Sequence, residues 1–458
     1  MIEKLRVVRK SLLLLCKLLM IGIMVAIFYN IWLKNYPELT AFFFKGYLVM
    51  AGLYGVILLT FCSLYGALRF GINRLSEINY SLFLSIVVTN ILTYFQYSLT
   101  AISLLKFSPI ILITILQMTV AVICSYGINK LYFCLYPARD MVVIHVNNDS
   151  SKGIIEKLMM RKERYKVKER ISENCGVEKL KETIDKYGSV LICDIDPALR
   201  KELFVYSSLM GKRVYVAPNV QDVMIKNSHS TQLFDTPLFY CKNSGISTEQ
   251  TFIKRVLDIL FSFIAIIVSS PFMLLIWIAI KIEDRGPAIY SQKRLTYHGK
   301  EFYVHKFRSM IPDAEKNGRA KLANKDDERI TKVGKVIRKI RLDELPQLFN
   351  ILKGDMSLVG PRPERPEIAK KYEKVIPEFR LRLEVKAGLT GYAQIYGKYN
   401  TTPQDKLLLD LMYIDNYSLL LDIKMLFMTL KIIFMPESTE GIENGANLPI
   451  PSPSKEKR

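Results

Sequence analysis

The chain has 458 residues, of which 50% are hydrophobic, and a formal net charge of +21. This length exceeds what one hydrophobic core usually organises, so two or three domains are expected. The apolar residues lie in long runs, which indicates a membrane protein, and the basic excess suits anionic lipid head groups or phosphorylated substrates. The sequence has no zinc-knuckle spacing and no basic-aromatic strand pattern, which argues against nucleic acid as a partner. Its seven cysteines are scattered singly, which argues against disulfides and metal ligation.

Four apolar runs open the chain, each near or above the ~20 residues that a membrane-spanning helix needs. They cover about 11–33, 41–64, 80–105 and 108–128. Basic residues concentrate before the first run, between the second and third, and after the fourth. By the positive-inside rule, the N-terminus and everything after about residue 130 are predicted to be cytoplasmic. Residues 1–135 are therefore predicted to form a four-helix transmembrane domain; a bare anchor would explain them, although not Lys17 in the first run.

Short apolar segments then alternate with polar helical segments up to about residue 218, which indicates a small parallel α/β domain. Strands are predicted at 141–146, 165–170, 189–195 and 213–217, and helices at 152–161, 177–186 and 197–210. The turn after the first strand, Asn147–Gly153, holds one glycine where a dinucleotide-binding fold has G-x-G-x-x-G. A regulatory or assembly role is therefore favoured over a nicotinamide-dependent one. With a linker that includes a strand near 237–241, this domain covers 136–245.

The next apolar run, at 256–280, is long enough to span a bilayer at ~1.5 Å per residue. Ser270 and Pro271 lie near its centre, and proline removes a backbone donor and disfavours the helical conformation of the residue before it. Basic residues flank both ends. We therefore predict a re-entrant helix over 254–283 that breaks at Ser270-Pro271 and returns to the cytoplasmic face. The alternative is a kinked spanning helix, which would place everything after residue 281 outside the cell.

The C-terminal part contains one more strongly apolar segment, Tyr417–Phe434. Lys424 and Lys431 share one face of this segment, as in a helix that lies in the membrane interface; a buried core helix is the alternative. The tail over 436–458 is rich in Pro, Glu, Gly and Ser and is predicted to be disordered. The remainder, 246–435, is predicted to be a mixed α/β catalytic domain.

Two adjacent acids, Asp343 and Glu344, lie between a basic stretch and a helical pattern that follows Pro346. Proline is tolerated in the first turn of a helix, so a helix is predicted to begin at 342–344 with both acids at its positive end. Phosphate also binds at such ends. The alternative is that Asp343 is an ordinary helix cap.

A second candidate for anion binding, Gly360-Pro361-Arg362-Pro363, follows closely. It is a rigid turn that presents one guanidinium, which suits bidentate contact with phosphate. Its closeness to the two acids favours a phosphate site over a simple turn.

The region from Lys254 to Phe434 resembles the bacterial sugar transferase family, the monotopic polyprenyl-phosphate glycosyl-1-phosphate transferases. The resemblance rests on an ordered series of motifs: Ser270-Pro271, Gln292-Lys293-Arg294, Lys306–Met310, Asp326–Thr331, Arg338-Lys339, Leu342–Leu348 and Lys353–Pro363. The upstream helices and α/β domain are similar to those of large members that start capsule, exopolysaccharide or O-antigen repeat units. Two segments depart from the family pattern, Lys386-Ala387-Gly388 and Ile395–Asn400, so the sugar is not assigned.

The resemblance implies transfer of a sugar-1-phosphate from a UDP-sugar to undecaprenyl phosphate, with release of UMP. It implies that Asp343 is the nucleophile, which forms a phosphosugar–aspartate, and that Glu344 holds Mg²⁺. It also implies a set of phosphate-binding residues: Lys306, Arg308, Arg338 and Arg362. The expected location is the bacterial inner membrane with the catalytic domain on the cytoplasmic face, and a homodimer is compatible with the sequence.

Two other functions stay open. One is a membrane-anchored nucleotide-sugar epimerase or dehydratase that works through the α/β domain, against which the missing glycine fingerprint argues. The other is a non-catalytic scaffold for polysaccharide assembly, against which the intact pair Asp343-Glu344 argues.

Overall fold

The computed structural model describes residues 2–35, 44–146, 148–241, 245–311, 329–397 and 401–433. The predicted disordered tail, the motif residues Asp326–Glu328 and the segment Lys398–Asn400 lie outside these ranges. The chain divides into two compact units, Met1–Pro218 and Asn219–Arg458, and each is described by itself. The finer domain boundaries expected from the sequence stay predictions.

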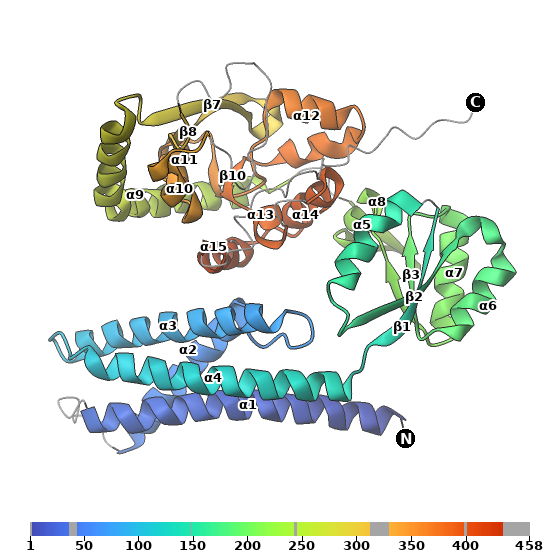
Figure 1. The fold of residues 1–458 in the computed structure, drawn as a ribbon, viewed down its shortest axis with the longest axis horizontal. Helices are drawn as coiled ribbons and strands as arrows, with labels where there is room; N and C mark the ends of the chain where they lie inside the picture. Colours follow the sequence, from blue (N-terminus) through green and yellow to red (C-terminus); the bar gives the residue numbers. More distant parts are fainter. Residues whose placement is uncertain are drawn as a thin grey trace. The chain divides into compact units, whose positions relative to one another are not determined.

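Four long helices form the first part of unit 1 (Figure 1): α1 (Ile2–Asn35), α2 (Phe44–Leu64), α3 (Leu75–Thr100) and α4 (Ser108–Leu135). Each contains a stretch that is long and apolar enough to cross a membrane, which confirms the predicted N-terminal membrane helices. In their core, the hydroxyl of Tyr54 donates to Asn90 Oδ1 (2.7 Å), Asn90 Nδ2 donates to Gln117 Oε1 (3.0 Å), and Gln117 Nε2 donates back to Tyr54 Oη (2.8 Å). These hydrogen bonds join α2, α3 and α4 within their apolar core.

The second part of unit 1 is a parallel sheet in the order β2-β1-β3-β4, which confirms the predicted α/β domain. Its side chains alternate between two apolar layers, as the period of two along a strand requires. Val142 and Ile144 point into one layer, and Met141 and Val143 into the other. The strands are β1 (Arg139–His145), β2 (Tyr165–Ser172), β3 (Ser189–Cys193) and β4 (Arg213–Val216), and the helices are α5 (Asn148–Met159), α6 (Val177–Lys186) and α7 (Pro197–Leu209).

Unit 2 begins with a segment that the sequence predicted as a linker with one strand. The structure instead has a helix and an antiparallel hairpin: α8 (Val220–Lys226), β5 (His229–Leu233) and β6 (Thr236–Tyr240). The prediction missed β5 because its polar residues lack apolar alternation. Val223 of α8 is buried in the main core of unit 2, so this helix packs with the part of the chain that follows it.

Helix α9 (Thr248–Asp284) contains Pro271 and is drawn in Figure 1 as two arms that meet at a corner. The hydroxyl of Ser270 donates to the carbonyl of Ile267 (2.8 Å), which is the acceptor that the missing N–H of Pro271 leaves vacant. The helix is therefore bent at its proline, as such helices commonly are, and it is not interrupted as the sequence suggested. It is also long and apolar enough to cross a membrane, so its return to the cytoplasmic face stays a prediction.

The rest of unit 2 surrounds a core that includes Ile351, Phe379, Leu407 and Met425. Its strands are β7 (Ile289–Leu295), β8 (Glu301–Phe307), β9 (Ser357–Val359) and β10 (Gly388–Thr390). Its α-helices after α9 are α10 (Lys332–Lys339), α11 (Gln347–Lys353), α12 (Pro366–Glu373), α13 (Tyr392–Tyr396), α14 (Pro403–Asp415) and α15 (Leu419–Ile433). Lys431 of α15 is buried. The two lysines of α15 therefore do not form the solvated face of an interfacial helix, and the alternative of a packed helix describes this face.

Candidate active site

The two acids lie in η4 (Leu342–Glu344), a single 3-10 turn that precedes α11. The N–H groups of Glu344 and Leu345 donate to the carbonyls of Arg341 (3.2 Å) and Leu342 (3.3 Å). The α-helix itself begins only at Gln347, so the prediction that it begins at 342–344 is wrong by about one turn. The residue that caps α11 is Pro346, and no side chain accepts a hydrogen bond there. Asp343 is therefore not a cap of this helix.

Two cations from distant parts of the sequence contact Glu344. Lys306 of β8 places Nζ 2.8 Å from Glu344 Oε1, and Arg362, after β9, places Nη2 3.1 Å from the same oxygen. The side chain of Glu344 is only 13% exposed, whereas that of Arg362 is 41% exposed. Strand β8, the acid turn and the Gly-Pro-Arg-Pro turn thus meet at one carboxylate, with Arg362 on the accessible side.

The two acids have opposite electrostatic environments. Burial alone would raise the pKa of Glu344, but Lys306, Arg362 and Arg341 together hold that pKa well below its usual range. Burial raises the pKa of Asp343 to about 6, and the charge of Glu344 adds to this effect. Asp343 has no ion pair within the described part of the chain. One acid is therefore fixed as an anion while its neighbour titrates near neutrality, a pattern typical of functional sites.

The other predicted phosphate-binding residues divide into two cases. Arg338 lies in the last turn of α10, and its charge acts on Asp343. Arg308 is buried and pairs with Asp284, the last residue of α9. Its guanidinium lies against Gly286, where any Cβ would overlap it. This contact fastens the end of α9 to β8, and a phosphate-binding role for Arg308 stays a prediction.

A buried ion network, which the sequence did not suggest, supports the turn that carries Arg362. Arg382 donates from Nε to Asp410 Oδ2 (2.9 Å) and from Nη2 to the carbonyl of Arg362 (2.9 Å). Lys406 pairs with Glu364, whose pKa its cationic neighbours lower to about 2 against the opposing effect of burial. Because these partners are 20 to 42 positions apart, no local motif marks them in the sequence.

The donor groups suit a magnesium ion that is shared with a substrate. Among the described residues, no group of three or more His, Cys, Asp and Glu side chains could hold a metal alone. Mg²⁺, however, commonly binds one or two carboxylates together with substrate phosphates. Asp343 and Glu344 provide two neighbouring carboxylates, and both ion pairs of Glu344 use Oε1. The two carboxylates therefore suit a magnesium ion that also binds a substrate diphosphate, and not one that is held by protein ligands alone.

Comparisons with known proteins match this part of the chain. The sequence profile of the bacterial sugar transferases matches residues 249–436. A 185-residue segment is 45% identical to the UDP-N-acetylgalactosamine-undecaprenyl-phosphate N-acetylgalactosaminephosphotransferase of Aeromonas hydrophila and covers 40% of this chain and 44% of the relative. A 238-residue segment is 36% identical to the undecaprenyl-phosphate galactose phosphotransferase of Salmonella typhimurium and covers 48% and 49%.

A shorter relative is covered more fully. A Bacillus subtilis protein named for undecaprenyl-phosphate N-acetylgalactosaminyl 1-phosphate transfer is 52% identical over 131 residues, which are 29% of this chain and 73% of the relative. In the two longer relatives, the matched segment spans just under half of the protein. The family match thus covers the part of unit 2 that holds the acid turn and its cations.

Proposed function

Because the chain belongs to the bacterial sugar transferase family, we propose that it transfers a sugar-1-phosphate from a UDP-sugar to undecaprenyl phosphate and releases UMP. The observation that carries this proposal is Asp343, a half-buried carboxylate with no ion pair among the described residues, beside Glu344 and its two cations. The names of the relatives supply the acceptor and the type of group transferred. The proposed site of action is the cytoplasmic face of the bacterial inner membrane, and the product starts a polysaccharide repeat unit.

In the first step, an Asp343 oxygen attacks the phosphorus that carries the sugar. The bond from that phosphorus to the bridging oxygen of the diphosphate breaks, and UMP leaves with the electron pair. The product is a phosphosugar–aspartate. With a pKa of about 6, the carboxyl group is largely ionised at neutral pH and is therefore available for attack.

In the second step, a phosphate oxygen of undecaprenyl phosphate attacks the same phosphorus. The bond to Asp343 breaks, the carboxylate is restored, and undecaprenyl-diphosphate-sugar leaves. An acceptor that is anchored in the bilayer must meet the site at the membrane surface. The long apolar helix α9, in the same unit as the acids, is suited to hold the site there.

Phosphoryl transfer depends mainly on positioning and on stabilisation of charge. We assign Lys306, Arg338 and Arg362 to the diphosphate of the donor. Mg²⁺ held by Glu344 and diphosphate oxygens would neutralise further negative charge on the leaving group. Arg341, which is half-buried beside both acids, adds to the positive field without a direct role.

A donor screen tests the proposal. Full-length protein in nanodiscs would be incubated with undecaprenyl phosphate, Mg²⁺ and a panel of UDP-sugars, and UMP release would be measured. At least one donor should give UMP in excess over the enzyme only when the acceptor lipid is present. Folded protein that releases no nucleoside monophosphate from any donor would favour the scaffold, and NAD bound to the purified protein would favour the epimerase or dehydratase.

A further inference from the structure

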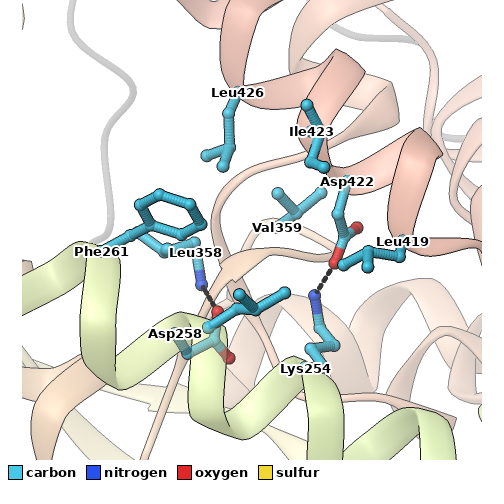
Figure 2. Close-up of a pocket in the computed structure, with 10 residues that line it drawn as sticks. Lys254, Asp258, Phe261, Leu358, Val359, Leu419, Asp422, Ile423 and Leu426 are labelled. Carbon is cyan, nitrogen blue, oxygen red and sulfur yellow. Dashed lines mark hydrogen bonds and ion pairs between the residues drawn. The ribbon is translucent and has the colours of Figure 1, made fainter.

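One acidic side chain of α9 binds the strand that leads to Arg362. Asp258 Oδ1 accepts hydrogen bonds from the backbone N–H of Leu358 (2.9 Å) and from the hydroxyl of Ser357 (3.1 Å). Figure 2 shows Asp258 and Leu358 facing one another across this contact. Strand β9 pairs with β10 along its other edge. The carboxylate therefore occupies the position that a further strand would otherwise take.

A second contact lies one helical turn earlier on the same face of α9. Lys254 Nζ is 2.5 Å from Asp422 Oδ2 of α15, and the hydroxyl of Tyr413 donates to the other oxygen of Asp422 (2.8 Å). The same hydroxyl lies 3.2 Å from the carbonyl of Val359 in β9. Figure 2 shows both charged side chains of α9 directed at the small pocket between α9, β9 and α15. Helix α9 is therefore fixed to β9 by hydrogen bonds as well as by apolar packing.

The connection from β9 to Arg362 is short and rigid. Only Gly360 and Pro361 separate Val359 from Arg362, and proline fixes its own φ. Gly360 packs so closely on the segment that leads into β10 that a Cβ there would overlap the carbonyl of Lys386. Arg362 Nη2 then reaches Glu344 Oε1 at 3.1 Å. A shift of β9 would therefore be passed on to the guanidinium.

Burying the carboxylate of Asp258 is energetically unfavourable unless it makes compensating interactions. Asp258 is the only charged residue in the run 256–280, and its side chain is buried. Burying a carboxylate is unfavourable unless hydrogen bonds compensate it, as Leu358 and Ser357 do here. This lone charge in an apolar segment is the signal that sequence reasoning missed, because ionisable residues in such segments are commonly functional.

We propose that Asp258 is a positioning residue, which acts through β9 to hold Arg362 where it meets Glu344 and the diphosphate of the donor. The Lys254–Asp422 pair braces the same helix face. This inference rests on the proposed function. It assigns to α9 a second role besides membrane attachment, since the helix also sets the geometry of the phosphate-binding turn.

The test compares three variants of the full-length protein in nanodiscs. Asp258→Ala removes the acceptor, Asp258→Asn keeps an oxygen that can accept from Leu358, and Leu257→Ala removes packing from the same pocket without touching those hydrogen bonds. We expect kcat/KM for the UDP-sugar to fall at least about tenfold for Asp258→Ala and to stay within about threefold for the other two. Equal values for Asp258→Ala and the wild type would overturn the inference.

A double-mutant cycle separates positioning from general loss of structure. If Asp258 acts through Arg362, adding Arg362→Ala to Asp258→Ala should cost much less than it does in the wild type. Independent, multiplicative losses would contradict the inference. If Asp258→Ala does not fold, Ser357→Ala, which removes one of the two hydrogen bonds, replaces it in the cycle with the same expectation.

Measuring the affinity for UDP alone distinguishes a failure of the positioning role of Asp258 from a failure of the proposed transferase function. Asp258→Ala and Arg362→Ala should weaken UDP binding by a similar factor, measured by calorimetry with Mg²⁺. If the wild type binds UDP but transfers no sugar phosphate with any donor, the proposed function fails while the binding cycle still decides on Asp258. Unchanged UDP affinity in Asp258→Ala would count against the positioning role whatever the activity.

Discussion

Two groups of charged residues contact the Gly-Pro-Arg-Pro turn, and they differ in how their acids are paired. In the ion network around Arg382, Glu364 and Asp410 each contact a cation. In the acid turn, both contacting cations bind Glu344. Asp343 has no ion pair among the described residues. In the ion network both acids are therefore paired with cations, whereas in the acid turn the Asp343 carboxylate stays available for reaction.

This difference separates a stabilising cluster from a reactive one. When a buried acid pairs with a cation, removing either partner leaves the other charge buried without compensation, which destabilises the fold. A buried acid that has no ion pair gains nothing for the fold, which is reflected in the raised pKa of Asp343. Variants of the two regions should consequently fail in different ways.

The largest expected effect is loss of turnover in Asp343→Asn. The amide keeps the shape of the carboxylate but cannot form the acyl phosphate, so UMP release should fall by about 10,000-fold or more. Its thermal stability should equal or exceed that of the wild type, because the replaced charge was unfavourably buried. With donor but no lipid, mass spectrometry should find a phosphosugar on the wild-type peptide that contains Asp343. Normal turnover of the Asn variant would refute the mechanism.

The ion network should respond in stability. Asp410→Ala leaves Arg382 buried without its main partner, and we expect a loss of about 3–5 kcal/mol in the free energy of unfolding, measured by denaturant titration in detergent. The double variant Arg382→Met/Asp410→Leu should recover part of this loss, because it removes both charges. If the single and double variants were equally destabilised, the pairing of these charges would not be the cause.

Glu344→Gln should weaken catalysis together with the response to metal. The amide loses the charge that pairs with Lys306 and Arg362 and that would hold Mg²⁺. We expect activity to fall by roughly 100-fold and the Mg²⁺ concentration for half-maximal activity to rise. An unchanged Mg²⁺ response, measured alongside the wild type, would place the metal ligand elsewhere.

The smallest effect is a difference in pH dependence between the two regions. The folded-state pKa of Asp343, about 6, lies above its ordinary value of 3.8, so stability should rise as the pH falls from about 6 to about 4. For Glu364 the folded value, about 2, lies below the ordinary 4.5, so its contribution is lost only as the pH falls below about 4.5. Without added divalent cation, Asp343→Asn should remove the first change, about 2 kcal/mol, and leave the second. Identical unfolding profiles for the two proteins between pH 6 and 4.5 would contradict this assignment.

The elements predicted best were those with a regular hydrophobic pattern. The helix Val177–Lys186 has the ends that were expected, and the apolar runs became α1–α4, because hydrophobic pattern and length are local properties. The acids and the Gly-Pro-Arg-Pro turn were found because they form short motifs. The start of the helix near Asp343 was misplaced because a 3-10 turn and an α-helix share the same apolar spacing over so few residues.

Contacts between residues that are far apart in the sequence could not be predicted from it. Arg382 and Asp410 lie in segments with no unusual composition, and only the packing of α14 brings them together. Lys306 was found through its motif, but its contact with Glu344 was not, because that contact depends on how β8 lies beside the acid turn. For Arg308, the motif was read as phosphate-binding, whereas its contact with Asp284 depends on where α9 ends.

The contacts of Asp258 and Lys254 with the rest of unit 2 also have a consequence for the order in which the protein is synthesised and folds. Asp258 and Leu358 are 100 residues apart, and Lys254 and Asp422 are 168 residues apart. At about 5–20 residues per second, the ribosome makes α9 on the order of ten seconds before its last partner. Unpaired charges resist deep burial in hydrocarbon, so the first arm of α9 should wait at the membrane surface during this interval. The final docking of α9 thus depends on α15, and a nascent chain that stops before residue 422 would leave Lys254 without Asp422 as its partner.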